Sequence, residues 1–109
     1  MRTLVCFGVA AGLWTASAWA GQMYGSVSEG GRGVGAARIE IDCAGNVTPG
    51  ETASDGSYRV NVPQEGRCTF TVILQQRRAS IVVFSYPNPA KYDFELVRRP
   101  DGNLELRRR

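Results

Sequence analysis

The sequence contains no histidine. This absence excludes Ser-His-Asp and Cys-His catalytic arrangements, imidazole general bases and metal centres built on histidine. Most hydrolase mechanisms depend on one of these groups. We therefore expect a protein that is not an enzyme.

The sequence also lacks an apolar run long enough to span a bilayer, which needs roughly 20 apolar residues. Its longest run, residues 4–14, follows the basic Arg2 and precedes a small-Trp-small tripeptide that ends at Ala20. This order is typical of a signal peptide that is cut after the tripeptide. We predict a signal peptide over 1–20 with cleavage between Ala20 and Gly21; an uncleaved membrane anchor is the alternative.

The expected mature chain, residues 21–109, has the length of one small domain. It shows no apolar stretch of membrane-spanning length and no helical stripe. We expect an exported protein, periplasmic or secreted, without a stable membrane span after cleavage.

Cysteine is scarce, with three residues in the chain. Cys6 lies in the predicted signal peptide, which leaves Cys43 and Cys68. An even number of cysteines in a small exported chain predicts a disulfide, and closing this loop contributes about 3.5 kcal/mol in the chain-entropy model. Two unpaired buried thiols are the alternative.

The mature chain alternates apolar and polar residues with a period of two, which predicts strands. Both mature cysteines fall on the apolar face of their strands, as a bridge within one core requires. Seven stretches have strand character: 22–28, 37–43, 57–62, 67–74, 80–86, 91–96 and 104–107.

Stretch 80–86 is continuously apolar and β-branched in its middle, which favours a central strand that is covered on both faces. Gly, Pro, Asn and Asp gather between the stretches, and Asp55-Gly56 is the strongest hairpin signal. We predict an all-β fold, a small antiparallel β-sandwich of seven to eight strands.

Four segments in order resemble the carboxypeptidase regulatory-like domains. They are 25–27, 33–41, 52–60 with the Asp55-Gly56 hairpin, and 66–72. The resemblance covers about half of the chain and implies a transthyretin-like (prealbumin-like) β-sandwich over 21–109. It also implies a module that stabilises or recognises a larger partner, while the cysteine pair is not part of the family pattern.

The formal net charge is +3, and part of the excess lies in arginine pairs. An exported basic protein meets anionic polysaccharide, lipid headgroups or acidic proteins rather than nucleic acid. Tyr86 and Tyr92 flank a proline-rich loop and could face a sugar or peptide, together with Arg77 and Arg78. Closing of the sandwich edge by the tyrosines and a solvated charged edge are the structural alternatives.

Neighbouring carboxylates occur on the polar faces of two predicted strands, at Glu40 with Asp42 and at Asp93 with Glu95. Paired carboxylates serve glycoside hydrolysis, but outward positions of strands are usually solvated. We expect no catalytic residue, no metal site and no cofactor; calcium binding by a loop stays open.

These observations favour a non-catalytic exported binding or accessory module that recognises a protein or a cell-envelope component. The alternative is a carbohydrate-binding module for acidic glycans. The partner is then an unknown protein or an envelope polysaccharide.

The disulfide can be tested by intact mass of the mature protein before and after reduction and alkylation. We expect alkylation at both Cys43 and Cys68 only after reduction. Alkylation of the unreduced protein would show free thiols and contradict the bridge.

Overall fold

The computed structural model describes residues 21–109, and these contain strands and no helix. The predicted signal peptide, with Cys6 and Ala20, lies outside the described residues. The strands are β1 (Gln22–Glu29), β2 (Arg32–Gly33), β3 (Arg38–Cys43), β4 (Asn46–Glu51), β5 (Ser57–Asn61), β6 (Gly66–Leu74), β7 (Arg77–Ser85), β8 (Ala90–Arg98) and β9 (Leu104–Arg108).

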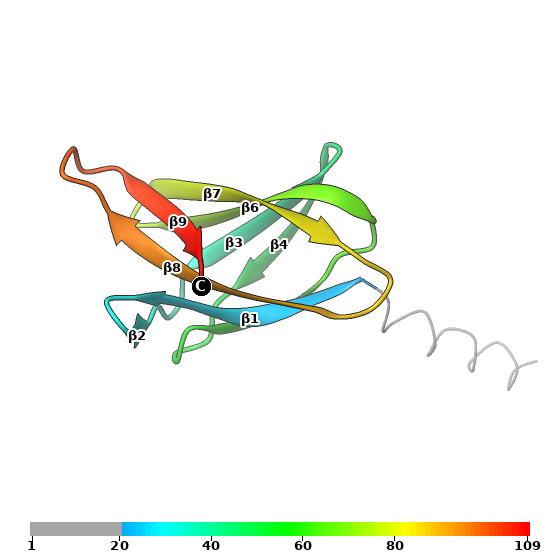
Figure 1. The fold of residues 1–109 in the computed structure, drawn as a ribbon, viewed down its shortest axis with the longest axis horizontal. Helices are drawn as coiled ribbons and strands as arrows, with labels where there is room; N and C mark the ends of the chain where they lie inside the picture. Colours follow the sequence, from blue (N-terminus) through cyan, green and yellow to red (C-terminus); the bar gives the residue numbers. More distant parts are fainter. Residues whose placement is uncertain (1–20) are drawn as a thin grey trace, which may run out of the picture.

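The strands form two facing sheets, as Figure 1 shows. Sheet A has the order β2-β1-β8-β9, and β5 also pairs with β1. Sheet B has the order β4-β3-β6-β7. The small β-sandwich predicted from the sequence is confirmed. All strand pairs are antiparallel except β1 with β8, which run parallel.

Two strands lie outside the seven stretches predicted from the sequence, so the described chain has nine. β2 is only two residues long and closes a short hairpin on the end of β1. β4 contains Pro49 and Gly50, which the sequence analysis assigned to a turn. Because β4 is an edge strand with one neighbour, it tolerates a proline that cannot donate a backbone hydrogen bond.

The expectation that 80–86 forms a central strand is wrong. This stretch belongs to β7, which lies at the edge of sheet B. Ala79, Val83 and Ser85 are buried, whereas Val82 and Phe84 are each 46% exposed. The apolar run therefore reflects an exposed apolar face rather than burial on both sides.

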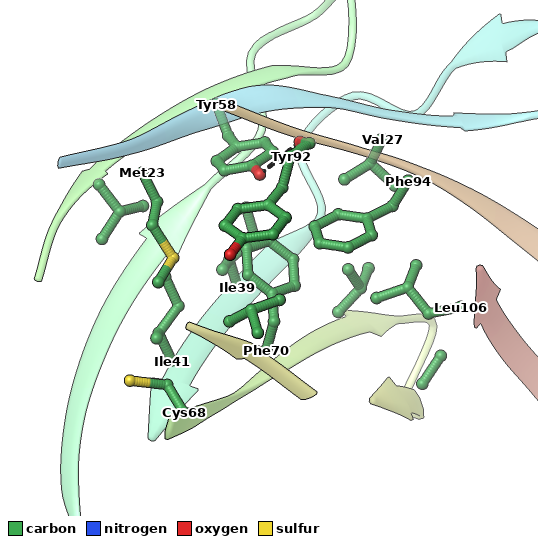
Figure 2. Packing of buried hydrophobic residues seen from close by; sticks show 14 of the residues in the cluster. Met23, Val27, Ile39, Ile41, Tyr58, Cys68, Phe70, Tyr92, Phe94 and Leu106 are labelled. Carbon is green, nitrogen blue, oxygen red and sulfur yellow. Dashed lines mark hydrogen bonds between the residues drawn. The ribbon is translucent and has the colours of Figure 1, made fainter. Parts of the chain in front are cut away.

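The core lies between the sheets and consists mainly of the predicted inward-facing residues (Figure 2). Aromatic rings form the centre of the core. The centroid of the Phe70 ring lies 5.2 Å from the centroid of the Tyr58 ring and 4.6 Å from that of the Phe94 ring. Such pairs stabilise a core beyond the free energy of apolar burial.

The predicted disulfide between Cys43 and Cys68 is confirmed. It joins β3 to β6, which are neighbours in sheet B, and both cysteines are buried. The antiparallel register places Asp42 of β3 opposite Thr69 of β6. Cys43, the next residue of β3, is therefore opposite Cys68.

A tyrosine hydrogen bond crosses the middle of sheet A. Gly25 of β1 is opposite Tyr58 of β5 on one side and Tyr92 of β8 on the other. The Tyr58 hydroxyl donates to the Tyr92 carbonyl oxygen at 2.6 Å, and so its side chain spans β1. Burial raises the pKa of Tyr58, with smaller effects of Asp93 and Tyr92, and this keeps the hydroxyl protonated as a donor.

Gly25 is required for this arrangement. Its φ is 153°, and a Cβ added there would collide with the carbonyl oxygen of Tyr92. No flexible side chain can move away to make room, because the obstacle is backbone.

We expect Gly25→Ala to lower the free energy of unfolding by at least about 2 kcal/mol, since the collision forces β1 and β8 apart. The measurement is chemical denaturation. Gly30→Ala is the control: this glycine also has positive φ but has open space around it, so only the backbone cost of about 1 kcal/mol applies. Equal losses in both variants would contradict the role of Gly25.

Candidate functional site

The residues predicted from the sequence to form a binding surface are not brought together. Arg77 and Arg78 begin β7, whereas Tyr86 follows its end. Tyr86 is nine positions after Arg77 along an extended strand. At about 3.3 Å per residue, the two residues are about 30 Å apart. A single small ligand cannot contact both ends.

Tyr92 is a core residue. Its side chain is buried, and its hydroxyl both donates to the Phe84 carbonyl oxygen at 2.9 Å and accepts from the Phe84 N–H at 3.1 Å. The Arg108 guanidinium lies 4.8 Å from the centre of its ring. Tyr92 thus joins β8 of sheet A to the edge strand of sheet B, and its ring is not available for stacking on a ligand.

The two arginines at the start of β7 already contact protein groups. The Arg77 guanidinium donates to the carbonyl oxygen of Gly102, and Arg78 forms an ion pair with Glu40 at 3.2 Å. Both line a small hollow of about 400 Å³ beside the loop that precedes β9. Tyr86 is 51% exposed but lies far from them along the strand.

A larger hollow of about 750 Å³ lies on sheet A, where β5, β1 and β8 are adjacent. The register places Tyr24 of β1 directly between Arg59 of β5 and Lys91 of β8. The next row on the same face of β1 is Ser26, between Ser57 and Asp93. We call this site the Tyr24 hollow; its lining residues are Tyr24, Gly25, Ser26, Glu51, Thr52, Ala53, Ser57, Tyr58, Arg59, Lys91 and Asp93.

The charges in the Tyr24 hollow are balanced. Arg59 and Lys91 are cationic, and Glu51 and Asp93 are anionic. Asp93 accepts a hydrogen bond from the Ser26 hydroxyl at 3.1 Å and lies 3.8 Å from the Lys91 ammonium group. Arg59 takes part in none of the ion pairs formed within residues 21–109.

The wall of the hollow, formed by the last residue of β4 and residues 52–53 after it, is held by hydrogen bonds. The Thr52 N–H donates to the Ala37 carbonyl oxygen at 2.9 Å, and the Thr52 hydroxyl accepts from the Ala37 N–H at the same distance. The Ala53 N–H donates to the Ser57 carbonyl oxygen at 2.8 Å. These hydrogen bonds fix the wall in one conformation, and a fixed wall lowers the entropic cost of binding.

The strongly exposed apolar side chains lie elsewhere. Val82 and Phe84 alternate along β7 with buried neighbours, and Val47 of β4 is opposite Asp42 of β3. Val82, Phe84 and Val47 are on the outer face of sheet B. Tyr86, which is also exposed, comes directly after the end of β7. The exposed apolar side chains and the Tyr24 hollow are thus on opposite faces of the sandwich.

The carboxylates considered for catalysis or metal binding are engaged locally. Glu40 pairs with Arg78, and Asp42 accepts the Gly45 N–H at 2.9 Å. Asp55 accepts the N–H and hydroxyl of Ser57, and these bonds lower its pKa. Within residues 21–109, no group of three or more His, Cys, Asp or Glu could hold a metal ion.

Sequence reasoning did not identify Tyr24, Arg59 and Lys91 as one site. Alternation placed each of them on the outward face of its strand, but they are separated by 35 and 32 residues in the sequence. Only the strand order β5-β1-β8 places them in one row. The available signal was an aromatic residue, Tyr24, on the same face of the strand as the polar residues Gln22 and Ser26.

No family model matches the sequence, and no curated protein matches it either. Among residues 21–109, no helix is long and apolar enough to cross a membrane. The disulfide is compatible with the expected export.

We expect Tyr92→Phe to lower the free energy of unfolding by about 1–3 kcal/mol, because it removes both hydrogen bonds to the Phe84 backbone. Thermal or chemical denaturation measures this loss. Tyr86→Phe is the matched control and should leave stability unchanged, since Tyr86 is exposed. If Tyr92→Phe is as stable as the wild type, the hydroxyl does not join the sheets as described.

Proposed function

We propose that this chain is a non-catalytic binding module, exported to the periplasm or the cell exterior, that recognises a protein or an envelope component. The Tyr24 hollow carries this proposal. It is open, its wall is held by backbone hydrogen bonds, and it presents an aromatic ring between two cationic side chains. Such a pre-formed hollow with few convergent polar groups is typical of a binding site.

The chemistry of the hollow supports binding rather than catalysis. Acid–base catalysis by carboxylates requires two groups that flank one bond with different proton affinities. Asp93 is held by the Ser26 hydroxyl and the Lys91 ammonium group, and no second carboxylate is shown to share a bond with it. The sequence supplies no histidine that could replace it.

The relationship to carboxypeptidase regulatory-like domains is part of this proposal. Three contacts support it. A Cβ at Gly33, in the first glycine-rich turn, would collide with the carbonyl oxygen of Asp55. The N–H of Val27 donates to the Gly56 carbonyl oxygen at 2.9 Å, and β3 pairs with β6. Each of the four segments that carry the resemblance therefore contacts at least one of the others.

The alternative of an acidic-glycan module used Tyr86, Tyr92 and the arginine pairs. Tyr92 is inside the core, and Arg77 and Arg78 contact Gly102 and Glu40. A carbohydrate remains a candidate ligand because the Tyr24 hollow offers another aromatic ring. The carbohydrate would then bind on sheet A and not at the end of β7.

The proposal is tested by cross-linked capture of the full chain in its own exporting cells, followed by mass spectrometry and sugar analysis. We expect the wild type to retain at least one protein or polysaccharide that Arg59→Glu loses, because the substitution reverses a charge in the hollow. Arg67→Glu, an exposed arginine of β6 on the other sheet, is the matched control and should retain it. Identical material on all three chains, or none, would contradict the proposal.

A further inference from the structure

We infer that the Tyr24 hollow binds an uncharged, hydroxyl-rich carbohydrate segment. The inference rests on the proposed binding function and names the class of ligand. Its basis is the combination of one aromatic ring, matched cationic and anionic side chains, and a floor formed by the face of a fully paired strand.

The floor excludes a ligand that adds as a strand. β1 pairs with β5 on one side and β8 on the other over Met23 to Ser26. Its backbone N–H and C=O groups are already used by these neighbours, so a peptide cannot bind there by β-strand addition. Recognition must come from side chains.

The lining excludes an apolar ligand. Two rows of side chains form the floor, one centred on Tyr24 and one on Ser26. Tyr24 supplies the aromatic ring of these rows, and it is only half-buried. Its neighbours on this face are serine, arginine, lysine and aspartate. The exposed valines and Phe84 that would suit a lipid or an apolar protein surface lie on sheet B.

The charge balance favours a neutral ligand over a polyanion. Arg59 and Lys91 donate hydrogen bonds, while Glu51 and Asp93 accept them. A polyanion would gain from the two cations but would be repelled by the two carboxylates. Sugar hydroxyl groups both donate and accept, and so they can satisfy all four side chains.

The size of the floor suits a short oligosaccharide. Three adjacent strands span about 10 Å, and two rows of side chains on one face are about 7 Å apart. The half-buried Tyr24 ring lies in the centre of one row, where a sugar ring can stack on its apolar face while the phenol hydroxyl stays in water.

The experiment is calorimetric titration of the full chain with soluble hexasaccharides: cellohexaose, maltohexaose and N-acetylchitohexaose as neutral probes, and hexagalacturonate as an acidic probe. We expect at least one neutral probe to bind with an affinity that is the same at low and high salt, because no net charge is neutralised. Tyr24→Ala should raise the dissociation constant at least about tenfold, and Arg59→Gln should raise it as well.

Tyr24→Phe keeps the ring and should retain most of the affinity, which separates stacking from loss of the fold. Tyr86→Ala and Arg67→Gln are matched controls outside the hollow and should bind as the wild type does. Circular dichroism of each variant verifies folding.

Binding of hexagalacturonate alone, with an affinity that falls at high salt, would overturn the assignment of a neutral ligand. If no saccharide binds but Arg59→Glu still loses a captured protein in cells, the carbohydrate inference fails while the binding function stands. If neither saccharide nor captured material depends on the hollow, both proposals fail.

Discussion

Three hydrogen bonds made by two core tyrosines link strands of both sheets of this sandwich. Tyr58 reaches across β1 to the Tyr92 carbonyl oxygen, and the Tyr92 hydroxyl bonds to both backbone groups of Phe84. One chain of side chains thereby connects β5, β8 and β7, that is, both sheets. Buried polar groups are costly unless they are paired, so each tyrosine contributes apolar burial and satisfies its own hydroxyl.

This connection also determines where the candidate site lies. The Tyr92 carbonyl oxygen, which accepts the Tyr58 hydroxyl, lies where a Cβ of residue 25 would be, so its position requires a glycine there. The row that contains Gly25 lies between the rows of Tyr24 and Ser26. The close approach of β5, β1 and β8 at Gly25 thus aligns Arg59, Tyr24 and Lys91 on the neighbouring row. The core contact and the Tyr24 hollow depend on the same strand register.

The two edge strands of sheet B are protected in different ways. The Tyr92 hydroxyl occupies the backbone groups of Phe84 on β7, and β4 contains Pro49. Free backbone groups on an edge strand attract pairing with other chains, and both features reduce this tendency. Side-chain recognition on the face of sheet A is therefore better supported than strand addition at these two edges.

The sequence by itself determined the all-β class, most strand positions, the inward faces and the Cys43–Cys68 pair, because alternation and cysteine number are local or countable properties. It did not determine which strands are neighbours. The sequence predicts a central β7 because an apolar run looks alike whether one face or both are covered. For Tyr92 the sequence leaves two roles open, contact with a ligand and closure of the sandwich edge, and the fold places it in the core. The parallel pairing of β1 with β8 and the row Arg59, Tyr24 and Lys91 were decided by tertiary structure, since they depend on contacts between residues far apart in the chain.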